Sequence, residues 1–182
     1  MWFLVSVVTS LAGAALHFLY DLLPGPFTAL ISPVNESVWE HLKLLFWPML
    51  IGAAVLSRGR KHKERFWSSF FVALLAAPSF LLLSYYGLKL FGIESLVIDI
   101  SLYFAGMFLG YLLAWLLYRK GKPERIGGFA LMLVILYAAS LILFTFAVPN
   151  LPIFRECIAD CPLHLVGAEL FTYYFSELKI FY

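Results

Sequence analysis

Five long apolar runs constrain the fold of this chain more than any other feature of its sequence. They cover residues 2–23, 42–56, 66–90, 96–118 and 126–148. A helix needs about 20 apolar residues to cross roughly 30 Å of hydrocarbon, so we expect the second span to start earlier, as 36–56. The runs are continuously apolar, which is typical of membrane helices and not of barrel strands. The sequence therefore predicts an all-α, polytopic membrane helical bundle of about five transmembrane helices.

The composition supports this assignment and excludes a water-soluble globule. Hydrophobic residues make up 63% of the chain, charged residues make up 13%, and the mean hydropathy is +0.90. So little polar surface cannot cover a soluble protein. We expect a multi-pass protein of the cell membrane whose partner is the lipid bilayer. The chain has no Gly-rich phosphate loop, so we expect no nucleotide and no nucleic acid as partners, and the oligomeric state stays open.

Two basic loops predict the orientation of the bundle. The segments SRGRKHKERF (57–66) and YRKGKPERI (118–126) hold most of the lysines and arginines, and short cytoplasmic loops carry such an excess. We interpret both loops as cytoplasmic anchors for anionic lipid. Five helices then place the N-terminus inside and the C-terminal tail, residues 149–182, outside. We expect this tail to belong to the same domain as the transmembrane bundle, residues 1–148. We expect Cys157 and Cys161 in that tail to be free or oxidised rather than metal ligands.

The motif SPVNESVWEHLKLLFWP (32–48) places polar residues at the start of the second span. Ser32 followed by Pro33 is typical of an N-cap and a first helical position. A helix starting there places Glu36, Glu40 and Lys43 on one stripe, with His41 on its flank. Acids in a first turn favour the positive end of the helix dipole. That effect does not explain two carboxylates one turn apart, where their charges repel.

The first span carries a second pair of polar residues, His17 and Asp21, at the same membrane level as the motif. Ionisable residues within a membrane indicate a functional site, and histidine and carboxylate pairs on facing helices build metal sites in bundles. A mixed histidine and carboxylate set suits a divalent transition metal such as zinc. The candidate metal ligands are His17, Asp21, Glu36, Glu40 and His41. The candidate catalytic residues are Glu36 and Glu40, and the supporting residues are Asn35, Lys43, Asp99 and His164.

Two other interpretations of this polar set stay open. It can be a structural network of buried hydrogen bonds, in which Lys43 pairs with Glu40 or Glu36. It can also be a pathway for protons or ions through the bundle. No HExxH or other diagnostic metal-binding spacing is present to decide among them.

The segment SPVNESVWEHLKLLFWPML, preceded by HFLYDLL, resembles the signature of a family of small uncharacterised prokaryotic multi-pass membrane proteins. The resemblance covers the N-terminal third of the chain. It implies no activity, because that family is a domain of unknown function. The positions of its motif correspond here to His17, Asp21, Asn35, Glu36, Glu40 and His41.

Two active classes of function and one structural class fit these residues. The first is a membrane-embedded, metal-dependent enzyme of the hydrolase type, acting on a lipid-linked or amphipathic substrate at the outer face. The second is a small cation- or proton-coupled transporter or permease subunit. The lack of a visible inverted repeat argues against a transporter that acts alone. The third class is a structural membrane subunit.

Overall fold

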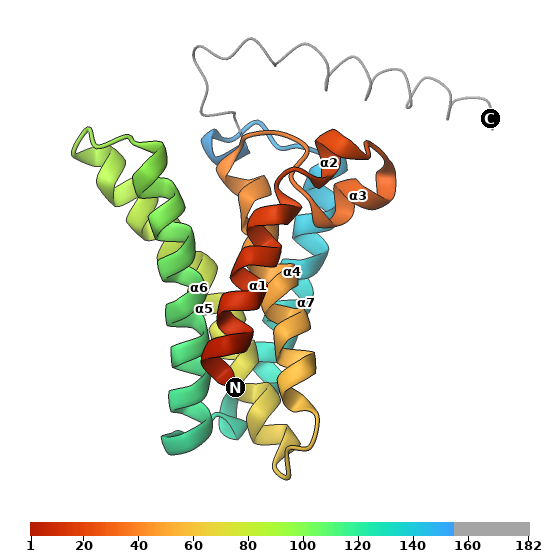
Figure 1. Cartoon of the computed structure of the whole chain (residues 1–182), viewed down its shortest axis with the longest axis vertical. Coiled ribbons are helices and arrows are strands. Elements are labelled where there is room, and N and C mark those ends of the chain that lie inside the picture. The colour runs from red at the N-terminus through yellow and green to blue at the C-terminus, as the bar shows by residue number, and fades with distance from the viewer. Residues whose placement is uncertain (155–182) are drawn as a thin grey trace, which may run out of the picture.

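The computed structural model describes residues 1–154, and these fold entirely into helices and their connections (Figure 1). Three helical segments come before the quoted motif: α1 (Trp2–Leu16), α2 (Leu19–Leu22) and α3 (Pro26–Ile31). The motif then leads into four long helices, which are α4 (Val38–Ser57), α5 (Lys63–Leu90), α6 (Leu96–Lys120) and α7 (Glu124–Phe146). A short 3-10 helix, η1 (Pro152–Phe154), follows α7.

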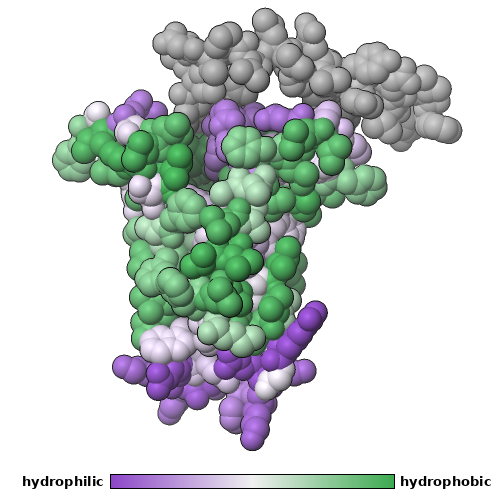
Figure 2. Space-filling view, viewed as in Figure 1, coloured by the Kyte–Doolittle hydropathy of each residue, from purple (hydrophilic) through white to green (hydrophobic). Residues whose placement is uncertain are grey.

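The four long helices are each long and apolar enough to cross a membrane. The α1 helix is apolar but has only 15 residues, which corresponds to about 22 Å and is shorter than the hydrocarbon layer. Apolar side chains cover the sides of the bundle, and hydrophilic residues gather at its ends, most densely at the lower end in Figure 2. The sequence-based prediction of an all-α membrane bundle is confirmed.

The first apolar run, 2–23, is not one continuous helix. Near the end of α1 the backbone tightens, because the amides of His17 and Phe18 bond to the carbonyls three residues before them, on Ala14 and Ala15. The carbonyl of Leu16 accepts a hydrogen bond of 2.6 Å from the Ser32 hydroxyl. The chain then leaves the α1 axis and forms the short helices α2 and α3 across this end of the bundle (Figure 1).

The α4 helix begins at Val38, so the sequence-based assignment of its cap was wrong. Ser37 is the N-cap, and its side chain accepts a hydrogen bond from the Glu40 amide. Ser32 instead ends α3 and directs its hydroxyl toward α1 and α2. Both serines match the residue preference at a helix N-cap. The contact between Ser32 and Leu16 joins two segments that are distant in the sequence, so a local pattern does not predict it.

The bundle has two unlike ends (Figure 1). The N-terminus lies with the α4–α5 loop and the α6–α7 loop at what we call the basic end, where the hydrophilic surface of Figure 2 gathers. The segments α2, α3 and η1 lie at the opposite end with the α5–α6 loop and residues 32–37, and we call it the motif end. We propose that the basic end faces the cytoplasm, as the excess of lysine and arginine there predicts.

Cysteine labelling tests this orientation. After Cys157 and Cys161 are replaced by serine, a cysteine at exposed Asn150 should react with an impermeant thiol reagent added to intact cells, and one at exposed Lys61 should not. Lys61 is a better site than neighbouring Gly59, whose φ of +76° strains other residues. Reaction at Lys61 in intact cells, with none at Asn150, would reverse the orientation. Permeabilised cells provide the control, because both cysteines should react there.

A stripe of small and polar residues fits α1 into the bundle. Gly13 faces the α4 backbone, and a Cβ atom built there lies 2.5 Å from the Leu44 carbonyl oxygen. Thr9 of α1 donates a hydrogen bond to its own helix and forms one of 3.0 Å with the Tyr111 hydroxyl of α6. Tyr103 of α6 donates to the Ser10 carbonyl at 2.8 Å. Close backbone approach and side-chain hydrogen bonds therefore hold α1 in place, as is common between membrane helices.

Candidate metal centre

Three side chains from separate parts of the chain meet at the motif end. His17 follows α1, Glu36 lies in the loop before α4, and His41 lies in the first turn of α4. Each offers one ligand atom, and these atoms all lie within 4.8 Å of one another. Glu36 contacts both rings, with its Oε1 3.9 Å from His17 Nε2 and its Oε2 3.4 Å from His41 Nε2. Glu36 of the motif and His17 of the first span, which the sequence predicts at one membrane level, are therefore in contact.

The backbone fixes which nitrogen of His41 faces the group. Its Nδ1 lies 2.8 Å from the Ser37 carbonyl oxygen, which can only accept a hydrogen bond. Nδ1 therefore carries a proton, and the lone pair of neutral imidazole lies on Nε2, which faces Glu36. Two acceptors 3.4 Å apart repel unless a proton or a cation lies between them. Metal-bound histidines commonly have this arrangement, with the second nitrogen held by a carbonyl.

The group is accessible from outside the bundle. The Glu36 side chain is 47% exposed, and the side chains of His17 and His41 are 33% and 31% exposed. When a proton lies between them, the hydrogen bond from His41 Nε2 holds the pKa of the Glu36 carboxyl below its usual value. Partial burial opposes this effect, and the charges of His41 and His17 also lower the pKa. Glu36 is therefore ionised at neutral pH, as a metal ligand must be.

The loop that carries Glu36 is held on both sides. The Asn35 side-chain oxygen accepts a hydrogen bond of 3.0 Å from the Ser37 amide, which forms a turn of the Asx type. The Val34 amide donates to Glu40 Oε2 at 3.0 Å. Glu36 lies between these two contacts, so the loop directs its side chain toward the histidines.

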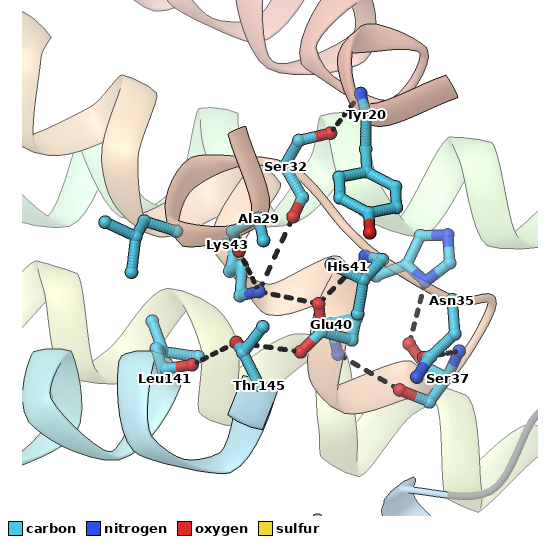
Figure 3. Close-up of polar contacts among 12 residues, drawn as sticks. Tyr20, Ala29, Ser32, Asn35, Ser37, Glu40, His41, Lys43, Leu141 and Thr145 are labelled. Carbon is cyan, nitrogen blue, oxygen red and sulfur yellow. Dashed lines mark hydrogen bonds and ion pairs between the residues drawn. The ribbon is translucent and has the colours of Figure 1, made fainter. Parts of the chain in front are cut away.

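Beneath this loop lies a buried ion pair. Lys43 Nζ lies 2.6 Å from Glu40 Oε2, and the two side chains are 0% and 3% exposed (Figure 3). Lys43 also donates to the Ala29 carbonyl at 2.8 Å, and Glu40 Oε1 accepts from the Thr145 hydroxyl at 3.2 Å. The pair therefore joins α3, α4 and α7, and its charges have several hydrogen-bond partners, as buried charges require.

Ser32 links the buried pair to the His17 region. Its carbonyl lies 3.5 Å from Lys43 Nζ, and its hydroxyl accepts from the Tyr20 amide (Figure 3). The same hydroxyl donates to the Leu16 carbonyl. His17 lies directly after Leu16 in the chain. The same network thus supports both the Glu36 loop and the segment that carries His17.

The structure separates the residues that the sequence grouped together. Glu36 and Glu40 do not share a helical stripe, because Glu36 precedes α4. Glu36 contacts the histidines, whereas Glu40 contacts Lys43, Val34 and Thr145. Of the two partners that the structural interpretation left open for Lys43, the structure shows Glu40.

Asp21 and Asp99 lie outside the three-residue group. Asp21 lies in α2 rather than one turn after His17 on a continuous helix, and its side chain is exposed. Asp99 is exposed in the first turn of α6. His164, Cys157 and Cys161 lie outside the described residues.

Sequence reasoning missed two supporting groups. Thr145 lies more than 100 residues after Glu40 and also donates to the Leu141 carbonyl at 2.7 Å, a common helix contact that carries no local signal. The Ser37 carbonyl orients His41, and its i, i+4 spacing to that histidine was a signal that could have been used.

The geometry suits a tetrahedral divalent ion. Zinc binds histidine nitrogen and carboxylate oxygen at about 2.0–2.1 Å, so its ligand atoms lie roughly 3.4 Å apart. The Glu36 Oε2–His41 Nε2 distance of 3.4 Å already matches. The three ligand atoms lie within 4.8 Å of one another, so the side chains must approach by up to about 1.4 Å to hold one ion. Two histidines and one carboxylate fill three positions and leave a fourth for water or substrate.

The fold and this group define a multi-pass helical membrane protein with a histidine and carboxylate group that could hold a metal ion at one end of its bundle. The chain belongs to a family described as a family of unknown function (DUF6512), whose model matches residues 1–161. The membership in an uncharacterised family that the motif predicts is confirmed. Comparison with curated proteins and with solved structures gave no match.

Proposed function

We propose that the protein is a membrane-embedded, metal-dependent enzyme of the hydrolase type. His17, Glu36 and His41 bind one divalent transition ion, with zinc as the best fit to the donor set. The observation that carries this proposal is the convergence of their three ligand atoms within 4.8 Å. Structural zinc sites are closed by four protein ligands, whereas three ligands with an open position are typical of catalytic sites.

The chemistry of the proposal follows from the open position. A zinc ion lowers the pKa of a bound water to about 7 and so supplies hydroxide at neutral pH. Glu36 is the carboxylate of this group and acts as a ligand. Glu40, the other candidate catalytic residue in the sequence, has its oxygens bonded to Lys43, Val34 and Thr145. We therefore assign Glu40 a positioning role, in which it holds the Glu36 loop.

The surroundings of the group favour an amphipathic substrate. Next to His17, the segment of α2 and α3 exposes four large apolar side chains, with exposed fractions of 60–82%: Phe18, Leu22, Leu23 and Phe27. Such side chains suit the bilayer interface or a lipid chain rather than water. A substrate with an apolar part in the membrane would present its polar linkage at the level of His17, Glu36 and His41.

Zinc titration of the purified protein tests the metal site. The metal-free protein in detergent should bind one zinc ion per chain. His41→Gln or His17→Gln should lower the zinc affinity by at least about 100-fold, because loss of a group that only supports a ligand already costs up to about 100-fold. His62→Gln is the matched control, because His62 is exposed in the basic loop. Affinities unchanged in both site variants would overturn the proposal.

A second assay tests the reaction class. The zinc-loaded protein should hydrolyse members of a panel of amphipathic esters and phosphoesters, and both a chelator and His41→Gln should abolish the activity. Zinc uptake into vesicles containing the protein, with no hydrolysis, would contradict the enzyme assignment and favour the transporter class.

A further inference from the structure

A second binding feature lies far from the metal group, between α1 and α6 near the basic end. It is a groove with a volume of about 250 Å³. Trp2, Phe3 and Ser6 line it from α1, and Phe108, Leu112 and Trp115 line it from α6. The Thr9–Tyr111 hydrogen bond joins the two helices farther along α1. The walls are almost entirely apolar, which suits a hydrocarbon chain.

Two arginines flank the groove at the basic end. The Arg60 guanidinium lies 5.3 Å from the centre of the Trp2 ring, and the Arg119 guanidinium lies 5.0 Å from the centre of the Trp115 ring. Trp2 and Trp115 both line the groove. Cation–π contacts at this distance hold the guanidinium groups over the rings without neutralising their charge.

Both guanidinium groups retain donors for an anion. The Arg60 Nε donates to the Leu56 carbonyl at 3.1 Å, which leaves its terminal nitrogens for other partners. Among residues 1–154, no carboxylate forms an ion pair with either arginine. This differs from Arg65 at the same end, whose Nε lies 3.8 Å from Glu124.

We propose that this groove binds an anionic glycerophospholipid from the leaflet at the basic end. One acyl chain lies between α1 and α6, and Arg60 and Arg119 contact the phosphate. The combination of an apolar groove, two uncompensated guanidinium groups and two tryptophans favours this occupant, because tryptophan rings lie at the headgroup level of bilayers. A partner helix would fit the apolar walls but would not need the two cations. A zwitterionic lipid has no net charge, so the two arginines would attract it less strongly than an anionic lipid.

Lipid titration followed by native mass spectrometry tests the site. The delipidated full-length protein in a neutral detergent is titrated with phosphatidylglycerol and with phosphatidylcholine of the same acyl chains. We expect tighter binding of phosphatidylglycerol. Arg119→Gln should reduce this preference about fivefold, as is typical for one basic residue near an anionic surface, and the Arg60→Gln, Arg119→Gln double variant should reduce it further. Arg119 is exposed, so its replacement leaves the core intact.

Matched controls separate the groove from the general basic charge. Arg125→Gln removes an exposed cation of α7 at the same end and should leave the preference unchanged. Leu112→Trp fills the groove and should weaken both lipids alike, while Leu131→Trp on the exposed surface of α7 should not. Equal binding of the two lipids by the unaltered protein, or equal effects of Arg119→Gln and Arg125→Gln, would overturn the proposal.

Discussion

Replacing Lys43 with methionine is expected to lower the free energy of unfolding by about 3–5 kcal/mol, because the change leaves the Glu40 carboxylate buried without its cation. Glu40 is 2% exposed and Lys43 is fully buried. The Ala29 and Ser32 carbonyls also lose their charged donor. Unfolding in mixed micelles, followed by circular dichroism, measures the change.

Two further variants sharpen this test. Lys89→Met breaks the exposed Lys89–Glu94 pair and should change stability by no more than about 1 kcal/mol. A Glu40→Gln, Lys43→Met double variant removes both charges and should recover most of the loss, since an uncharged pair of similar volume is often neutral. Equal effects of Lys43→Met and Lys89→Met would show that the buried pair does not stabilise the fold.

The buried pair also explains why the three proposed ligands meet. Glu36 lies on a loop whose Val34 amide bonds to Glu40, and His17 follows Leu16, whose carbonyl bonds to Ser32. Lys43 contacts both Glu40 and the Ser32 carbonyl. One interior network therefore supports two chain segments that each supply a ligand, and contacts that hold the ligands in place in this way tune metal affinity.

The fold class was predictable from the sequence because length and hydropathy suffice for a membrane helix. Each long apolar run forms a helix whose backbone hydrogen bonds all lie within the run, so its helical structure in the bilayer does not depend on neighbouring segments. The break after Leu16 was not predictable. It depends on Ser32, which lies 16 residues later and reaches back to the Leu16 carbonyl.

The sequence named the three residues of the candidate site, but it also named Asp21 and Glu40, which lie outside the group. The sequence placed two histidines and two glutamates at one membrane level, and the structure brings Glu36 to both histidines. The prediction of one shared stripe failed because it depended on which serine caps α4. Ser32 and Ser37 are both suitable caps. Because the cap is Ser37, five residues after the predicted one, Glu36 lies outside the helix.

A second large effect is expected when Gly13 is replaced by alanine. Its new Cβ atom would lie 2.5 Å from the Leu44 carbonyl oxygen and 3.1 Å from Pro48 Cγ, and it would also meet the Tyr103 hydroxyl. The backbone of α4 cannot rotate away as a side chain does, so α1 must move outward. We expect a loss of about 3 kcal/mol, at the upper end of the usual cost of overpacking.

Gly128→Ala in α7 is the matched control, because no atom lies within 4 Å of the added Cβ. It should be neutral or slightly stabilising, since alanine favours helix over glycine by up to about 1 kcal/mol. Gly13 lies one turn before His17, and an outward shift of α1 moves that histidine away from Glu36. Gly13→Ala should therefore also weaken zinc binding, although residue 13 supplies no ligand. Unchanged stability and unchanged zinc affinity in Gly13→Ala would show that the fold does not require the close contact between α1 and α4 and that this contact does not position His17.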